Sequence, residues 1–212
     1  MKNVDDLIES AAELADRGLS KGEIADELNV SRETASWLVD RSGKATQATS
    51  KPTASGGPQD VHVDWSAIGR DSKRMSAIAS AMADMLLKHG EEIDLTVGIE
   101  KAGGPIASLV AKDLETDLAT YTPAKHQWEE GDIEELGGTF SRNFATIRGR
   151  ECYVVDDTIT SGTTMRETIK AIRAEGGEPV ACVVLADKQG VDELEGVPVY
   201  SLLQVISVGK EE

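Results

Sequence analysis

The sequence predicts an α/β domain built on a parallel β-sheet and preceded by a small all-α domain. In residues 1–43 apolar side chains recur at the three- and four-residue intervals of amphipathic helices. Residues 44–60 contain no aliphatic residue larger than alanine, which is typical of a flexible linker. In residues 61–212 helix-like segments alternate with β-branched runs, a pattern that favours a parallel sheet with ligands at the carboxyl ends of its strands.

The first element is an amphipathic helix near the N-terminus. Its apolar residues recur on one face, from Val4 and Leu7 to Ala15. Acidic side chains, including those of Asp5 and Glu13, interrupt the apolar positions. Because no apolar run approaches the length of a signal peptide or a membrane span, we expect a soluble protein with no membrane partner.

Residues 19–39 have the apolar spacing of a helix-turn-helix unit. Ser20 is placed to cap the first helix of this unit, with Glu23 as its capping-box partner. Asn29 falls where the turn needs a left-handed backbone, and Ser31 begins the second helix. The residues expected to be buried are Ile24, Ala25, Leu28, Val30, Ala35 and Leu38.

The second helix of this unit is a candidate DNA recognition helix, since its outward side chains could reach base edges and phosphates in a major groove. We expect Arg32 and Ser36 to contact bases, and Arg41 and Lys44 to contact phosphates. Trp37 could instead pack under the linker. The expected DNA-binding residues are Ser31, Arg32, Thr34, Ser36, Trp37, Arg41 and Lys44. The alternative is a helical hairpin used for packing or dimer contacts, because such spacing recurs in many helical proteins.

After the linker, helices and strands alternate along the chain. Helices are expected at 72–88, from Pro105, and at 163–175. Strands are expected at 94–99, 118–121, 151–155 and 179–186. We therefore divide the chain into a helix-turn-helix domain (1–43), a linker (44–60) and an α/β effector-binding domain (61–212).

The stretch Cys152–Thr164 is the most informative segment for function. It runs from an apolar strand into the adjacent carboxylates of Asp156 and Asp157, and then into a loop of hydroxyl residues and glycine that opens a helix. The carboxylates can accept hydrogen bonds from a vicinal diol or approach a hydrated Mg²⁺, and the start of a helix suits a phosphate. A capped helix without a ligand needs a single hydroxyl. The segment therefore predicts a site for a phosphorylated ribose.

This segment resembles the loop that binds 5-phosphoribosyl 1-diphosphate (PRPP) in type I phosphoribosyltransferases, and Thr160 points to the orotate branch of that family. The resemblance extends over residues 61–207; within it Val97–Ala107 resembles the family's diphosphate loop and Leu185–Gly190 the strand end near its base pocket. It implies the family's parallel-sheet fold and a set of ligand-binding residues. These are Lys101, Gly103, Gly104, Asp156, Asp157, Thr158, Thr160, Ser161, Gly162, Thr163 and Thr164.

The segment Tyr121–Gly138 departs from the orotate phosphoribosyltransferase pattern. The family carries an Arg-Lys motif there, followed by a Lys and a His-Gly that meet the departing diphosphate. Here Lys125 and His126 stand without that pair, and the carboxylates of Glu129–Glu135 follow. Losing electrostatic stabilisation of this kind costs about 10²-fold or more in rate. Lys188 lies where the transferases carry Arg. Lysine can hold a phosphate or carboxylate, but it lacks the planar guanidinium with which arginine binds such groups through two hydrogen bonds. We therefore expect no catalytic residues and no enzyme activity.

We expect no required cofactor and no metal site of the protein's own. His62 and His89 have no Cys or carboxylate at zinc-ligand spacing. Mg²⁺ is expected only together with a diphosphate ligand. The two cysteines, Cys152 and Cys182, fall in apolar runs and cannot form a disulfide framework, which favours a cytoplasmic protein.

The chain is strongly acidic, with a formal net charge of −16 over 212 residues. The excess is spread along the chain rather than confined to a tail. In molar salt the screening length falls to about 3 Å, so such a surface costs little in self-repulsion and holds hydration. The composition favours a halophilic source, with an ordinary acidic mesophilic protein as the alternative.

The layout as a whole is similar to the archaeal transcriptional regulators of glucose and fructose catabolism. This resemblance implies regulation of sugar catabolism genes, with double-stranded promoter DNA as partner and a phosphorylated sugar metabolite or PRPP as effector. Because one helix-turn-helix reads a short half-site, we expect a homodimer or a higher homo-oligomer. The alternatives are an active orotate or purine phosphoribosyltransferase with an appended DNA-binding domain, and a small domain that binds protein instead of DNA.

Overall fold

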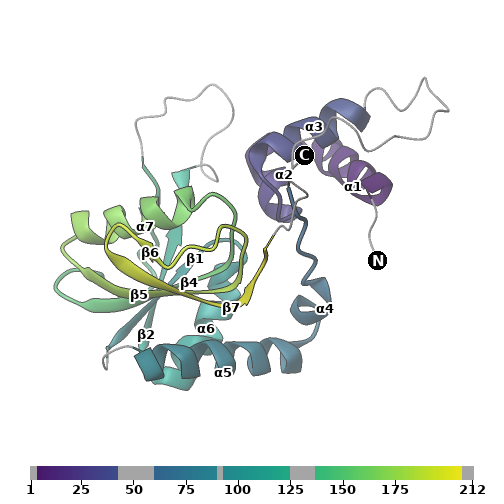
Figure 1. Cartoon of the computed structure of the whole chain (residues 1–212). Helices are drawn as coiled ribbons and strands as arrows, with labels where there is room; N and C mark the ends of the chain where they lie inside the picture. Colours follow the sequence, from purple (N-terminus) through teal and green to yellow (C-terminus); the bar gives the residue numbers. More distant parts are fainter. Residues whose placement is uncertain (1–3, 43–59, 90–92, 125–136, 207–212) are drawn as a thin grey trace, which may run out of the picture. The chain divides into compact units, whose positions relative to one another are not determined.

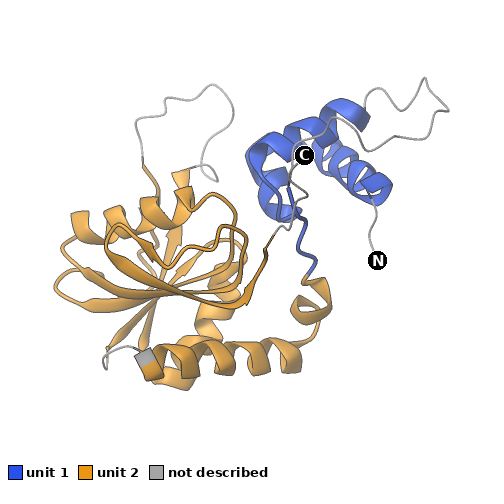
Figure 2. Cartoon of the chain, viewed as in Figure 1, with its two compact units in different colours: residues 1–64, 129–131 blue, residues 65–128, 132–212 orange. Residues whose placement is uncertain are grey.

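The computed structural model describes residues 4–42, 60–89, 93–124 and 137–206 (Figure 1). The chain forms two compact units, which Figure 2 shows in different colours: residues 1–64 with 129–131, and residues 65–128 with 132–212. Residues 43–59, which include most of the expected linker (44–60), lie outside the described residues. Within the described ranges, every helix is too short or too polar to cross a membrane.

The described part of the first unit contains three helices: α1 (Val4–Asp16), α2 (Lys21–Glu27) and α3 (Arg32–Ser42). The expected capping box is present, with Ser20 Oγ accepting from the Glu23 backbone N–H and the Glu23 side chain accepting from the Ser20 N–H at 3.0 Å. Asn29 has the left-handed backbone that the turn requires, with φ of 50°. These findings confirm the helix-turn-helix prediction.

The core of this unit is formed by the residues that the apolar spacing indicated. A single cluster of buried side chains joins the three helices: Ala11, Ile24, Ala25, Leu28, Val30, Ala35 and Leu38. Fully burying one such aliphatic side chain contributes about 1.5–3 kcal/mol. Packing of this shared face therefore holds helices that would be too short to be stable in isolation.

Residues 60–63 hydrogen-bond to the turn of the helix-turn-helix. The Ser31 backbone N–H donates to Asp60 Oδ2 at 2.5 Å, and the Asn29 side chain donates to the Val63 carbonyl at 3.3 Å. His62 Nδ1 contacts the carbonyl of Leu28, the C-cap residue of α2. The chain thus returns to this unit after the linker, which the sequence did not indicate.

The second unit is a seven-stranded sheet with strand order β3-β2-β1-β4-β5-β7-β6. The five central strands run parallel, and the short edge strands β3 and β6 pair antiparallel. The strands are β1 (Leu95–Ile99), β2 (Asp117–Thr122), β3 (Thr139–Phe140), β4 (Glu151–Ile159), β5 (Glu178–Asp187), β6 (Glu193–Leu194) and β7 (Val197–Gln204). This confirms the predicted α/β class with a mostly parallel sheet.

Helices cover both faces of the sheet (Figure 1). The helices of this unit are α4 (Ser66–Gly69), α5 (Ser72–His89), α6 (Gly103–Leu114) and α7 (Thr163–Ala174). On one face α5 and α6 pack against Tyr153 and Val155 of β4. On the other face α7 packs against Val154 of the same strand. Because successive residues of a strand point to opposite faces, the continuous apolar run of β4 supplies both cores.

One predicted boundary requires correction, because β4 continues to Ile159 instead of ending near residue 155. Asp156 and Asp157 therefore lie within the strand and not after it. The cause is that β5 also runs on to Asp187, so that pairing continues, with Asp156 opposite Val184. The short elements α4, β3 and β6, and the strand β7, were not predicted.

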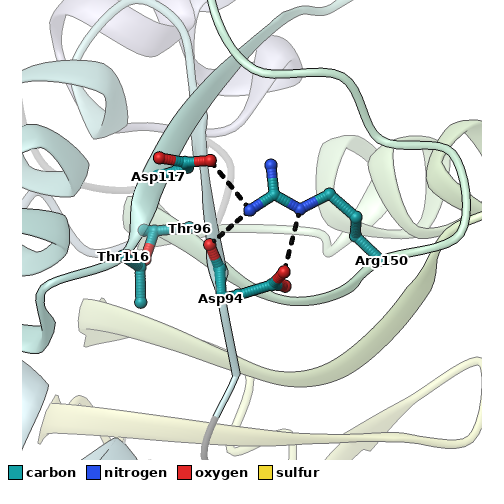
Figure 3. A network of polar contacts seen from close by, with 5 residues as sticks. All are labelled: Asp94, Thr96, Thr116, Asp117 and Arg150. Atoms are coloured by element: carbon teal, nitrogen blue, oxygen red, sulfur yellow. Dashed lines mark hydrogen bonds and ion pairs between the residues drawn. The ribbon is translucent and has the colours of Figure 1, made fainter.

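The amino ends of the central strands are joined by Arg150, which precedes β4. As Figure 3 shows, its guanidinium points toward Asp94 and Asp117. Asp94 immediately precedes β1, and Asp117 is the first residue of β2. It donates to the Asp94 carbonyl at 2.7 Å and to the Asp117 carboxylate at 2.9 Å. Beside them the hydroxyls of Thr96 and Thr116 lie 2.7 Å apart. This network fixes the end of the sheet opposite the carboxyl ends of its strands.

Candidate functional site

The two adjacent carboxylates in the second half of β4 are almost fully buried. Asp156 and Asp157 are 9% and 8% exposed. Asp156 Oδ1 accepts from the Asp157 backbone N–H at 2.8 Å. Asp157 Oδ2 accepts from the indole Nε1–H of Trp65 at 2.9 Å and from the Thr158 hydroxyl at 3.3 Å. A carboxylate held in this way has the chemistry to accept hydrogen bonds from hydroxyl groups, and the sequence predicts that role for both Asp156 and Asp157.

The loop after β4 presents hydroxyl groups at the start of α7. Gly162 occupies the N-cap position of α7 with φ of 73°, a conformation that glycine adopts without strain. The Ser161 hydroxyl donates to Thr163 Oγ1 at 3.0 Å, and both residues are exposed. Arg166 holds the loop by donating to the Ser161 carbonyl at 3.0 Å. Because α7 leaves unpaired N–H groups at this end, the loop is suited to an anion.

The second predicted loop, between β1 and α6, meets the first at Asp156. A Cβ atom on Gly103 would lie 2.8 Å from the Asp156 Cα, so only glycine permits this approach. Gly104 is more open, since a Cβ atom there would meet the Glu100 side chain at 3.9 Å as its nearest neighbour. Lys101 is exposed beside them. The structure therefore brings the two predicted ligand loops together at the carboxyl ends of β1 and β4.

Asp187, at the end of β5, is a residue of this region that the sequence reasoning did not single out. It is 1% exposed, and its carboxylate accepts from the backbone N–H groups of Gln189 and Val191 at 2.8 and 2.7 Å. The Gln189 side chain donates to the Thr160 carbonyl at 2.6 Å. This hydrogen bond joins the predicted base-pocket segment, Leu185–Gly190, to the hydroxyl loop. An acidic residue between a buried strand and a glycine is the signal that could have identified it.

Glu167 of α7 is a second residue that sequence reasoning missed. Its Oε1 accepts from the Tyr121 hydroxyl at 2.8 Å and from the backbone N–H groups of Ala124 and Gly138 at 2.9 and 3.2 Å. Burial, together with the hydrogen bond to Glu167, raises the pKa of Tyr121 well above its usual range. Ala124 and Gly138 border residues 125–136, which lie outside the described residues together with Lys125 and His126.

In the first unit, α3 carries most of the residues expected to bind DNA. Arg32 is exposed, whereas Ser36 is half-buried. The Arg41 guanidinium lies 5.0 Å from the centroid of the Trp37 ring, and Trp37 packs against the core of the unit. Trp37 therefore has a packing role and a stacking role. Lys44 lies outside the described residues.

The remaining two candidate residues form the start of α3. Ser31 Oγ accepts from the Thr34 backbone N–H at 3.1 Å, and the two hydroxyls lie 2.9 Å apart. These contacts satisfy one of the N–H groups that the first turn of a helix leaves unpaired. Ser31 and Thr34 thus stabilise the helix that presents Arg32.

Over the described ranges, no group of three or more His, Cys, Asp or Glu side chains is arranged to hold a metal ion. The two cysteines are free and buried. Burial raises the pKa of the Cys152 thiol to about 12 and that of Cys182 still further. Both thiols are therefore protonated at neutral pH and unreactive.

Comparison with known proteins gives a family and a set of relatives. The phosphoribosyl transferase domain family matches residues 64–209. A curated relative from Halorubrum lacusprofundi, named transcriptional regulator GfcR, is 70% identical over 212 residues, which cover 100% of both chains. Among solved structures, adenine phosphoribosyltransferase from Thermoanaerobacter pseudethanolicus has a TM-score of 0.56 and 19% identity, covering 73% of this chain and 94% of its own.

A second solved structure is orotate phosphoribosyltransferase from Mycobacterium tuberculosis, in complex with PRPP. Its TM-score is 0.53 and its identity 18%, covering 67% of this chain and 80% of its own. At these identities the two solved structures show a shared fold.

Proposed function

Because this chain belongs to the phosphoribosyltransferase domain family and, along its whole length, to the transcriptional regulators GfcR, we propose that it is a DNA-binding transcriptional regulator controlled by a phosphorylated metabolite. Double-stranded promoter DNA is the partner of the helix-turn-helix unit. The genes it controls are those of sugar catabolism, as the resemblance noted from the sequence implies. Several of its relatives, including the one from Halorubrum lacusprofundi, come from halophilic archaea, which agrees with the acidic composition.

The observation that carries this proposal is the combination of two sites in one chain. One is a capped three-helix unit in which α3 exposes Arg32. The other is the pair of loops around Asp156 at the carboxyl ends of β1 and β4. A phosphoribosyltransferase that acts only on small molecules has no use for the first site.

The second site has the chemistry for a phosphorylated sugar. Asp157 supplies an acceptor for sugar hydroxyls, and the start of α7 supplies N–H groups and the hydroxyls of Thr163 and Thr164 for a phosphate. PRPP and a sugar-acid phosphate both fit this description. If the ligand carries a diphosphate, Mg²⁺ would come with it and neutralise its charge.

Absence of catalysis is part of the proposal and rests on the sequence of residues 125–136. This stretch holds Lys125 and His126 but no Arg-Lys pair, and its carboxylates outnumber its cations. Negative side chains there would oppose the charge that develops on a departing diphosphate. The second candidate function, an active orotate or purine phosphoribosyltransferase, is favoured by the intact hydroxyl loop. Release of diphosphate from PRPP with orotate or adenine distinguishes the two.

We further propose that the chain acts as a homodimer or larger homo-oligomer. A single three-helix unit covers only a short half-site, and two units related by a two-fold axis match a palindromic site with centres about 34 Å or a multiple apart. Sedimentation of the full chain with and without DNA, at molar KCl, tests this. A monomer under both conditions would contradict it.

The experiment that tests the proposed function is selection of DNA by the full chain. Sheared genomic DNA from a halophilic archaeon is incubated with the protein at molar KCl, and bound fragments are sequenced. We expect enrichment of a short inverted repeat upstream of sugar catabolism genes. Enrichment should be weaker for Arg32→Ala, with a relaxed preference at one base position. Recovery of the same random fragments by the wild-type chain and by Arg32→Ala would contradict DNA recognition.

A further inference from the structure

The residues Asp60–Trp65, which we call the strap, make contacts in both units. Its first four residues lie on the turn of the helix-turn-helix, where Asp60 accepts from the Ser31 N–H and Val63 accepts from the Asn29 side chain. His62 Nδ1 contacts the Leu28 carbonyl in the same turn. The strap thus reaches the end of α2 and the start of α3, so its contacts hold the backbone that sets the angle between these helices.

The last residue of the strap, Trp65, belongs to the sheet unit. Its indole N–H donates to Asp157 Oδ2 at 2.9 Å, and its ring packs against α4, where a Cβ on Gly69 would lie 2.7 Å from Cζ3. Asp157 is the carboxylate that the proposed function assigns to the hydroxyls of a sugar. The indole and a sugar hydroxyl are both donors, so a sugar hydroxyl that approaches Asp157 Oδ2 would compete with the indole for that oxygen.

Very little chain separates these two sets of contacts. Only Asp64 lies between Val63 and Trp65. The Val63 carbonyl accepts a hydrogen bond from Asn29 in the helix-turn-helix, and the Trp65 indole donates one to Asp157. A residue spans at most about 3.6 Å of extended chain. The linker precedes the strap and does not divide it, so a movement of Trp65 away from Asp157 acts first on Asp64 and then on the residues that are hydrogen-bonded to the turn.

We propose that the strap couples the Asp157 carboxylate to the helix-turn-helix: when Trp65 leaves Asp157, the strap loosens its hold on the turn at Ser31. The sugar hydroxyl of the bound metabolite is what displaces the indole, and in this respect the inference rests on the proposed function. Trp65 is then a positioning residue that reports the state of the ligand site to α3.

Amide hydrogen exchange of the full chain tests the coupling without any DNA. The reporter is the Ser31 N–H, which donates a hydrogen bond to Asp60 Oδ2. The internal control is the Leu28 N–H, which donates to the Ile24 carbonyl at 3.0 Å at the end of α2. The variants are Asp60→Ala, Trp65→Phe and Asp157→Ala. Trp128→Phe serves as the matched tryptophan control.

We expect Asp60→Ala and Trp65→Phe each to speed exchange at Ser31 by about fivefold or more, the lower end of ordinary coupling between sites. In these variants the exchange rate at Leu28 should equal that of the wild type. In Trp128→Phe the exchange rates at both Ser31 and Leu28 should equal those of the wild type. Asp157→Ala should act like Trp65→Phe, and the double variant should exchange no faster than either single variant, because both remove the same hydrogen bond. Unchanged exchange at Ser31 in both Trp65→Phe and Asp157→Ala would overturn the proposal, as would unchanged exchange in Asp60→Ala.

PRPP provides a second arm with the wild-type chain. Once calorimetry shows PRPP to be bound, exchange at Ser31 should rise as it does in Trp65→Phe, and bound PRPP with unchanged exchange would contradict the coupling. The variants decide the outcome whether or not PRPP binds. If the chain selects no DNA while Trp65→Phe still speeds exchange at Ser31, the proposed function fails and the coupling stands.

Discussion

The hydroxyl of Tyr121 donates a 2.8 Å hydrogen bond to the carboxylate of Glu167 and so joins the end of β2 to the first half of α7. The same carboxylate oxygen also accepts from the backbone N–H groups of Ala124 and Gly138. Three donors on one oxygen hold together the chain on both sides of residues 125–136. Glu167 therefore holds Ala124 and Gly138, which lie on either side of residues 125–136, against α7.

The first prediction concerns this carboxylate. Glu167→Ala leaves a buried phenol and two backbone N–H groups without their acceptor, so it should lower the free energy of unfolding by about 1–3 kcal/mol. Tyr121→Phe, which removes a single donor, should cost less. Urea unfolding at molar KCl measures both. Glu175→Ala, an exposed acid at the end of the same helix, is the control and should stay within about 0.5 kcal/mol of wild type. Equal stability of Glu167→Ala and Glu175→Ala would contradict the role given to Glu167.

The second prediction uses the buried thiol of Cys152. Its folded pKa of about 12 lies above the ordinary value of about 9, because burial disfavours the thiolate. Above pH 9 the unfolded chain loses this proton while the folded chain keeps it, so the contribution to stability is present below pH 9 and is lost as pH rises towards 12. The loss is at most about 1.4 kcal/mol per pH unit.

The variant Cys152→Ala isolates this effect from other groups that titrate in the same range. It should be less stable than wild type at pH 8, because it leaves a small cavity, and the difference should narrow between pH 9 and 10.5. Urea unfolding at four pH values gives the two curves. Parallel curves would show that the thiol does not titrate on unfolding.

The third prediction concerns base reading by α3. Arg32→Ala should weaken binding to the selected DNA by about 1–3 kcal/mol and relax the preference at one base position. Arg17→Ala removes the same charge from an exposed residue that follows α1, so it serves as the matched control and should change binding to all sequences by the same small factor. Fluorescence anisotropy with selected and scrambled duplexes measures both. Equal losses on the two duplexes for Arg32→Ala would assign this side chain to the phosphates.

The fourth prediction concerns the hydroxyl loop. Replacing Thr163 and Thr164 together by alanine removes two hydroxyls at the start of α7, each worth about 1.5–3 kcal/mol if it donates to a charged phosphate. Calorimetry should show weaker binding of PRPP, and ligand-free binding to DNA should be nearly unchanged. Ser108→Ala is the control, since its hydroxyl bonds to the Pro105 carbonyl within α6. A double variant whose DNA binding still responds to PRPP would place the effector elsewhere.

Much of the fold follows from the sequence, because local signals and apolar periodicity act in the same direction. The capping box at Ser20 and the left-handed turn at Asn29 are local, and both are confirmed. The end of β4 has no local signal in the sequence, because it depends on pairing with β5, which continues to Asp187. The strand β7 was missed because its pattern is not a continuous apolar run, with residues such as Ser201 and Gln204 inside it.

In the candidate site, too, the features with a local sequence signal could be predicted and those that depend on distant residues could not. The glycines and hydroxyls of the two ligand loops are visible in the sequence because their chemistry is local. The hydrogen bonds of Glu167 to Tyr121 and of Trp65 to Asp157 join residues 46 and 92 positions apart. A single sequence contains no signal for such pairs, because many acidic residues could equally serve as the partner. The return of residues 60–63 to the helix-turn-helix was hidden for the same reason.

The central claim is that a phosphorylated ligand changes DNA affinity without being turned over. The most direct measurement is the dissociation constant of the selected DNA as PRPP and a series of sugar phosphates are titrated, with released diphosphate followed in the same samples in the presence of orotate or adenine. We predict that one of these compounds changes the dissociation constant by about 5–150-fold and that no diphosphate is released. A DNA affinity that stays constant across the series while PRPP is converted to diphosphate would contradict this account and identify the chain as an active transferase.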